Sequence, residues 1–130
     1  MTQVHDKLIG PVPTRIVDAA RLRVTPYEGR VAEYNIAAWL QVPGLANLPV
    51  SLLVSYRDAG KRREITIDHG KVSAHSKILL SGIARLPLKQ KIEDMQVRLR
   101  SAVPTQGLVV EELFVQAVEL ANSDSRQALA

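Results

Sequence analysis

The sequence contains no cysteine, which excludes disulfide bonds, thiolate nucleophiles and cysteine-ligated metal sites. Aromatic residues are scarce, with one tryptophan, three tyrosines and one phenylalanine among 130 residues, so the core must be aliphatic. No apolar stretch approaches the roughly 20 residues that a membrane-spanning helix requires, so we expect no membrane partner. Neither sign of charge dominates, because the sequence has 17 basic and 13 acidic residues and therefore a net charge of +4. That balance falls well short of a dedicated nucleic-acid-binding protein.

Catalytic signatures are also missing. The sequence has no nucleophile-elbow motif, phosphate-binding glycine loop or dinucleotide fingerprint. Glu111 and Glu112 are adjacent, so in a strand they face opposite sides and cannot act as a catalytic carboxylate pair. His69 and His75 fall in one predicted loop without a third ligand at a recognisable spacing. We therefore expect no enzyme, no cofactor and no metal site.

What the sequence does contain is a repeated alternation of polar and apolar residues, the pattern of half-buried β-strands. The alternation is clearest over residues 31–42 and 92–100, and proline and glycine separate the segments that carry it. Short strands at this spacing, with little helix, predict an all-β fold, an antiparallel β-sandwich of jelly-roll-like arrangement. The predicted core consists of Tyr34, Ile36, Leu40, Leu52, Val54, Ile65, Ile78, Leu80, Val97 and Leu99.

The chain length suits a single domain. We expect three parts: a flexible or edge-strand lead-in over residues 1–20, the sandwich over residues 21–120, and a disordered tail over residues 121–130. Prolines and a glycine argue against regular structure over residues 9–13, and the next seven residues fit either a helical turn or an edge strand. Residues 108–118 have helical spacing but strand propensity, and we favour the strand.

Six segments of the sequence follow one another in an order that is characteristic of a type of β-domain. These segments are residues 21–25, Tyr-Asn-Ile-Ala-Ala-Trp-Leu at 34–40, residues 50–58, Ser-Gly-Ile-Ala-Arg-Leu-Pro at 81–87, residues 95–101 and Val-Val-Glu-Glu-Leu-Phe-Val at 109–115. The order resembles the galactose-binding-like jelly rolls, and most of all the carbohydrate-binding modules that accompany glycoside hydrolases. This resemblance implies a jelly-roll fold and non-catalytic binding of a carbohydrate.

The sequence departs from that family at three places. Glu111 and Glu112 stand where the family usually has aspartates, and the opening Gly-Phe-Glu-type strand has no counterpart in residues 1–20. Residues 74–77 read Ala-His-Ser-Lys, where the family usually carries a tryptophan. The resemblance therefore supports the family's fold in this sequence more than it supports the family's sugar-stacking aromatic residues.

Candidate ligand-binding residues lie on the polar faces of the predicted strands. Trp39 and Gln41 face away from the core, where a tryptophan can stack on a sugar ring, unless both faces of this strand are buried. Gln96 and Arg98 share one strand face and Arg57 ends another, and guanidinium groups there suit hydroxyl-rich or anionic ligands, although a merely solvated face has the same pattern. We predict a non-catalytic binding module for a carbohydrate or another polar ligand, which Trp39 stacks against.

A second hypothesis is a structural or interaction protein that self-associates or docks a protein partner through a sheet face. Ala37, Trp39 and Leu53 make the outer faces semi-apolar, which suits a homodimer surface. The basic residues near the hairpin at 57–63, together with Arg98 and Arg100, would add only salt-sensitive binding, so no specific nucleic-acid partner is expected. No signal peptide is visible, so we expect a cytoplasmic protein; export within a larger or unconventionally secreted protein stays open.

Overall fold

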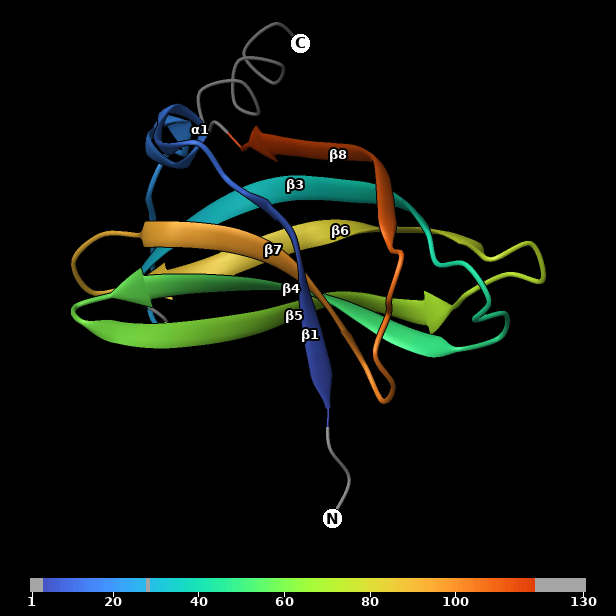
Figure 1. The fold of residues 1–130 in the computed structure, drawn as a ribbon. Helices are drawn as coiled ribbons and strands as arrows, with labels where there is room; N and C mark the ends of the chain where they lie inside the picture. Colours follow the sequence, from blue (N-terminus) through green and yellow to red (C-terminus); the bar gives the residue numbers. More distant parts are fainter. Residues whose placement is uncertain (1–3, 28, 119–130) are drawn as a thin grey trace, which may run out of the picture.

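The structure, a computed structural model, describes residues 4–27 and 29–118. This part of the chain forms strands almost throughout, with one short helix (Figure 1). The elements are β1 (His5–Pro11), α1 (Thr14–Ala19), β2 (Arg23–Thr25), β3 (Gly29–Gln41), β4 (Pro49–Asp58), β5 (Lys61–Lys71), β6 (Lys77–Leu88), β7 (Glu93–Ser101) and β8 (Val109–Ala117). None of the helices in the described residues is long and apolar enough to cross a membrane.

The strands form two antiparallel sheets that pack face to face. Sheet A has the order β1-β7-β4-β5, and sheet B has the order β2-β3-β6, with β8 also paired to β3. The short β2 pairs with the first residues of β3, while β8 pairs along the same edge of β3 from Tyr34 to Gln41. This arrangement confirms the predicted all-β antiparallel sandwich.

The core follows from the alternation along each strand. Even-numbered residues of β3 from Tyr34 to Leu40 face the other sheet and are buried, and β4 does the same from Val50 to Tyr56. The predicted core residues all belong to this cluster, although Ile65 and Ile78 are only partly buried. The two buried tyrosines keep their hydroxyls paired, since each donates a hydrogen bond to a backbone carbonyl oxygen.

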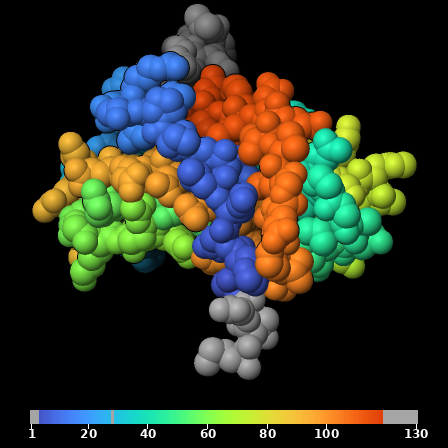
Figure 2. Space-filling view, viewed as in Figure 1, coloured from blue at the N-terminus to red at the C-terminus, as the bar shows by residue number. Residues whose placement is uncertain are grey.

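The two sheets approach closely along both sides of the sandwich. On one side, a Cβ atom added at Gly82 of β6 would lie 2.7 Å from Ile67 Cγ2 and 3.0 Å from the Ile67 carbonyl oxygen of β5, so only glycine fits. There the Ser81 amide donates to Asp68 Oδ2 at 2.9 Å. On the other side, β1 of sheet A approaches β8 of sheet B, where a Cβ atom added at Gly10 would lie 2.9 Å from Leu113 Cδ2. Figure 2 shows β1 beside the segment that precedes β8.

The beginning of the chain differs from the sequence-based expectation. The sequence predicts no regular structure over residues 9–13. This prediction is wrong for residues 9–11, because β1 extends to Pro11 at the edge of sheet A. An edge strand tolerates proline because one of its sides needs no ladder donor. The next segment takes the helical alternative as α1. Within residues 108–118 the strand is confirmed as β8, and the predicted tail at 121–130 lies outside the described residues.

Candidate functional site

The outer face of sheet B carries a group of exposed large hydrophobic side chains. Trp39 is 38% exposed, Phe114 45%, Leu79 50% and Ile83 61%. In the register, Trp39 is opposite Leu79 on β6, and Ala37 is opposite Phe114 on β8. All four exposed side chains therefore belong to one surface that spans β8, β3 and β6.

Trp39 and Phe114 are neighbours on this surface. Trp39 is opposite Glu112 of β8, so Phe114 occupies the diagonal position two residues further along the same strand face. Diagonal cross-strand neighbours lie about 7–8 Å apart, which is within reach of aromatic side chains. We call Trp39 and Phe114 the aromatic platform.

Polar side chains surround the aromatic platform. Gln41 follows Trp39 on the same face of β3 and is opposite Lys77 of β6, whose ammonium nitrogen lies 3.9 Å from Glu111 Oε2. Glu112 is the direct cross-strand partner of Trp39. The site thus combines a flat apolar centre with carboxylate and amide groups at its border, and it can hold the apolar face of a ring while bonding to its hydroxyls.

Further along β3, the same face of sheet B holds a buried carboxylate. Glu33 is 8% exposed and accepts hydrogen bonds from Arg23 Nη1 at 2.9 Å and from Arg85 Nη1 at 3.0 Å. Burial of a charge is tolerated here because the carboxylate is paired on both oxygens. The two arginines are partly exposed, so the surface between them stays polar.

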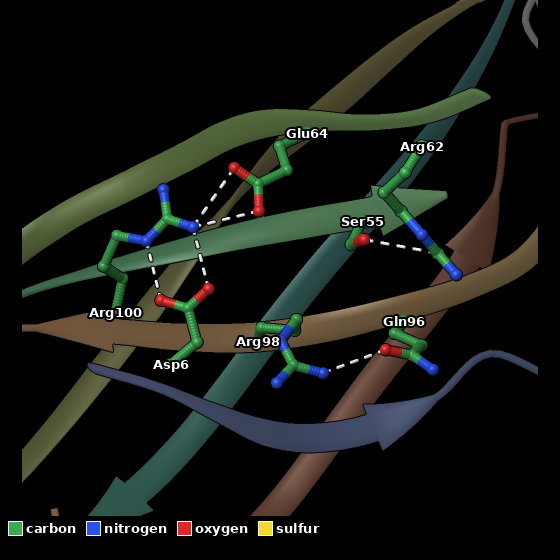
Figure 3. A network of polar contacts seen from close by, with 7 residues as sticks. All are labelled: Asp6, Ser55, Arg62, Glu64, Gln96, Arg98 and Arg100. Atoms are coloured by element: carbon green, nitrogen blue, oxygen red, sulfur yellow. Dashed lines mark hydrogen bonds and ion pairs between the residues drawn. The ribbon is translucent and has the colours of Figure 1, made fainter. Parts of the chain in front are cut away.

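The outer face of sheet A has a different character, since its polar side chains bond to one another (Figure 3). Arg100 of β7 donates from Nε and Nη2 to the two carboxylate oxygens of Asp6, at 2.7 Å each, and Nη2 also lies 2.9 Å from Glu64 Oε2. The hydrogen bond from Arg100 lowers the pKa of the Asp6 carboxyl and raises that of the guanidinium. This group joins β1, β7 and β5.

The neighbouring residues of sheet A are paired in the same way. Arg98 Nη1 donates to Gln96 Oε1 at 2.9 Å, and Arg62 donates to Ser55 Oγ at 3.2 Å and forms an ion pair with Asp94. Arg98 and Arg100 lie on the same outer face of sheet A as Arg57 and Arg62, and carboxylates neutralise Arg100 and Arg62 there.

The structure places the predicted ligand-binding residues in two groups. Trp39 and Gln41 lie together on the outer face of sheet B, whereas Arg57, Gln96 and Arg98 lie on the outer face of sheet A. The two outer faces point in opposite directions, so these five residues do not form one site. The alternative in which both faces of the Trp39 strand are buried is wrong, because Trp39 is exposed.

The sequence interpretation missed Phe114, Leu79 and Ile83. Leu79 and Ile83 alternate with the core residues of β6, which signals that they face outward. Phe114 gave no such signal, because residues 108–118 fit both helix and strand and because its partner strand, β3, is distant in the sequence.

The hollows and histidines lie away from the aromatic platform. A hollow of about 490 Å³ is near the end of sheet A and is lined by Ser51, His69 and Arg100 among others. His75 lies in the loop before β6, where its amide donates to Ser73 Oγ. In the part of the chain that the structure describes, no three histidine or carboxylate side chains gather as a metal site.

Comparisons with known proteins give one informative result. No family model matches the chain, and no curated protein matches its sequence. The structure is similar to that of the N-terminal CBM22-1–GH10 modules of endo-1,4-β-D-xylanase 10B from Clostridium thermocellum, solved with xylohexaose, with a TM-score of 0.52 at 16% identity. The match covers 65% of this chain but only 16% of the xylanase chain. The protein thus has a carbohydrate-binding-module-like β-sandwich fold.

Proposed function

We propose that the protein is a non-catalytic binding module that holds a carbohydrate on the outer face of sheet B. The observation that carries this proposal is the aromatic platform, because Trp39 and Phe114 lie exposed and adjacent on one flat sheet face. Aromatic rings offer a large apolar surface of low flexibility, against which the C–H face of a sugar ring stacks. The similarity of the fold to a xylanase structure that contains xylohexaose supports the same class of ligand.

The polar border of the platform supports binding of a hydroxyl-rich molecule. Gln41 supplies both a donor and acceptors, and the Glu112 carboxylate beside Trp39 accepts hydrogen bonds from hydroxyls. The platform lies on an exposed sheet face, which suits a chain of sugars better than a single small molecule. Sheet A is less suited, since the side chains of Gln96 and Arg98 already bond to each other.

The platform is tested by titrating the protein with xylohexaose and a panel of other oligosaccharides in calorimetry. We expect Trp39→Ala to weaken the binding of any sugar that binds by about thirtyfold, the effect of removing a central aromatic contact. The matched control is Arg98→Ala on the opposite face, which should leave the affinity unchanged. The proposal is wrong if no carbohydrate binds at millimolar concentration, or if Trp39→Ala binds like the unmodified protein.

A second candidate function is self-association through the same face. The observation that favours it is the pair of exposed aliphatic side chains, Leu79 and Ile83, beside the platform. Light scattering over a range of concentrations separates the two functions. A monomer that binds sugar supports the binding module, whereas a stable dimer that Ile83→Ser dissociates, without sugar binding, supports self-association.

A further inference from the structure

The outer face of sheet A is hollowed at the end where β4 begins. In the register, Ser51 of β4 lies between His69 of β5 and Arg100 of β7, which are its direct cross-strand partners. Direct cross-strand neighbours have Cβ atoms about 5 Å apart, so two long side chains stand on either side of one short side chain. This difference in length leaves a depression over the start of β4.

The next row of side chains, towards the end of the sheet, is apolar except for one lysine. Pro49 of β4 is opposite Lys71 of β5. Val4 and Ala102 lie just beyond the last residue pair of β1 and β7, and Val4 is 57% exposed. These four residues and the row that contains Ser51 line one hollow, which we call the sheet A hollow.

The sheet A hollow has the size and the composition of a site for a small molecule. Such sites have volumes of about 300–1,000 Å³ and combine an apolar lining with a few polar groups. The volume here is about 490 Å³, and apolar side chains at one end of the hollow adjoin polar side chains at the other. A ligand that fits it therefore has an apolar part and a polar part.

The polar side chains of the sheet A hollow are hydrogen-bond donors. Lys71 and Arg100 carry N–H donors and no acceptor, and Ser51 and His69 can each donate a further hydrogen bond. Among the described residues that line the hollow, none is an aspartate or a glutamate. The polar part of the ligand must therefore supply acceptor atoms, as a carboxylate does.

Arg100 is held in position by the two carboxylates that it contacts. Its Nε and Nη2 atoms each lie 2.7 Å from an oxygen of Asp6, and Nη2 also bonds to Glu64. Figure 3 shows the third nitrogen of the guanidinium turned away from both carboxylates. Because the group is already fixed, a hydrogen bond from this nitrogen to a ligand costs little side-chain entropy.

The carboxylates around the sheet A hollow leave one of its cations without an ion pair. Asp6 and Glu64 offset the charge of Arg100, so Arg100 contributes a hydrogen-bond donor. Asp68 precedes His69 but is opposite Leu52, on the side of β5 that faces sheet B, where it accepts hydrogen bonds from two backbone amides.

The remaining cation is Lys71. It forms no ion pair with any residue that the structure describes, whereas Arg62, Arg63 and Arg100 of the same sheet do. Lys71 therefore contributes the charge that attracts an anion to the hollow.

We propose that the sheet A hollow is a second binding site, for a small organic carboxylate. Its apolar body rests against Val4, Pro49 and Ala102, and its carboxylate is bound by Lys71 and Arg100. This inference is independent of the carbohydrate binding proposed for sheet B. An inorganic anion makes no use of the apolar lining, and a neutral sugar finds no carboxylate there to accept the hydrogen bonds of its hydroxyls.

The test follows the binding of phenylacetate through the backbone amide signals in ¹⁵N NMR spectra. We expect phenylacetate at millimolar concentration to shift the amide signals of Ser51, Gly70 and Ala102. Phenylacetamide lacks the negative charge, and acetate lacks the apolar body, so both should bind more weakly than phenylacetate. The proposal is wrong if phenylacetate shifts none of these signals, or if either of the other compounds binds as tightly.

A matched pair of lysine variants tests the role of the charge. Lys71→Gln should weaken the binding of phenylacetate by about two- to fivefold, the effect of losing one exposed ion pair, and should leave the binding of phenylacetamide unchanged. Lys61→Gln removes an exposed cation at the other end of β5 and should change neither. Equal losses in the two variants would show that only the net charge of the protein matters and would overturn the proposal.

A variant that fills the hollow tests its position. Ala102 is exposed just after β7, so Ala102→Leu should keep the fold, which its amide spectrum away from the hollow reports, and should abolish the binding of phenylacetate. Unchanged or tighter binding in this variant would overturn the proposal. Trp39→Ala on sheet B should leave the binding of phenylacetate unchanged, and a loss there would assign the ligand to the aromatic platform instead.

Discussion

The outer faces of the two sheets differ in whether their side chains contact one another or are exposed to solvent. On sheet A, charged and polar side chains bond to one another, as Arg100 does to Asp6 and Glu64. Leu53 on the same sheet is opposite Arg98 of β7 and is only 1% exposed. On sheet B, Trp39 and Phe114 are exposed. A polar layer that satisfies its own hydrogen bonds stabilises the sheet beneath it, whereas an uncovered apolar layer gains free energy only when something binds to it. The outer face of sheet A therefore stabilises the fold, whereas recognition is the role that we propose for the outer face of sheet B.

The largest difference between the faces should appear when one leucine is truncated on each. Leu53→Ala removes a buried side chain from under the polar layer of sheet A and should lower the free energy of unfolding by about 2–4 kcal/mol. Leu79→Ala acts on a side chain that is half exposed and should cost less than about 1 kcal/mol. Urea denaturation of both variants measures the difference. Equal losses would mean that the outer face of sheet B is covered in solution.

A smaller effect is expected from the ion pair that joins β1 to sheet A. Asp6→Asn should lower the free energy of unfolding by about 0.5–1 kcal/mol at neutral pH, since the pair is only partly buried. The hydrogen bond from Arg100 lowers the pKa of Asp6 below its usual value of 3.8, so the unfolded chain binds this proton at a higher pH than the native protein does. The contribution is complete above the usual value and is lost as the pH falls through the lowered one.

Unfolding measured against pH checks this expectation. The difference between the unmodified protein and Asp6→Asn should shrink progressively as the pH falls from 3.8 to about 2, because the native carboxyl becomes protonated. A difference that stays constant down to that pH would show that Arg100 does not stabilise the fold through the charge of Asp6.

The smallest effect should be spectroscopic and confined to sheet B. The protein has one tryptophan, so its fluorescence reports on the outer face of sheet B alone. A bound carbohydrate should protect Trp39 from acrylamide quenching, whereas Arg98→Ala on sheet A should leave the quenching unchanged and alter the free energy of unfolding by less than about 1 kcal/mol. Quenching that responds to Arg98→Ala but not to the ligand would contradict the division between the faces.

The alternation of residues along β3, β4 and β7 was sufficient to predict the sandwich and most of its core. A period of two decides which side chains share a face of a strand, and Tyr34, Leu52 and Val97 are buried accordingly. The proline and glycine residues of β1 led to the wrong prediction that this segment has no regular structure. Their effect depends on whether a strand lies at the edge of a sheet, which no local pattern in the sequence shows.

The candidate site was predictable only in part, for a related reason. Alternation places Trp39 and Arg98 on outward faces but does not say which sheet each strand joins. That depends on pairings between distant segments, such as β3 with β8 and β1 with β7. Phe114 was not predicted for the same reason, because it becomes a neighbour of Trp39 only when β8 pairs with β3.

The pairing of β1 with β7 also has a consequence for how the chain folds. His5 of β1 is opposite Ser101 of β7, so the hydrogen bonds of β1 can form only after most of the domain has been synthesised. The β4–β5 hairpin, by contrast, pairs across a two-residue turn. Loop-closure entropy makes such distant pairings late and slow. During synthesis, β1 therefore emerges from the ribosome long before its partner exists, and Asp6 meets Arg100 as one of the last contacts to form.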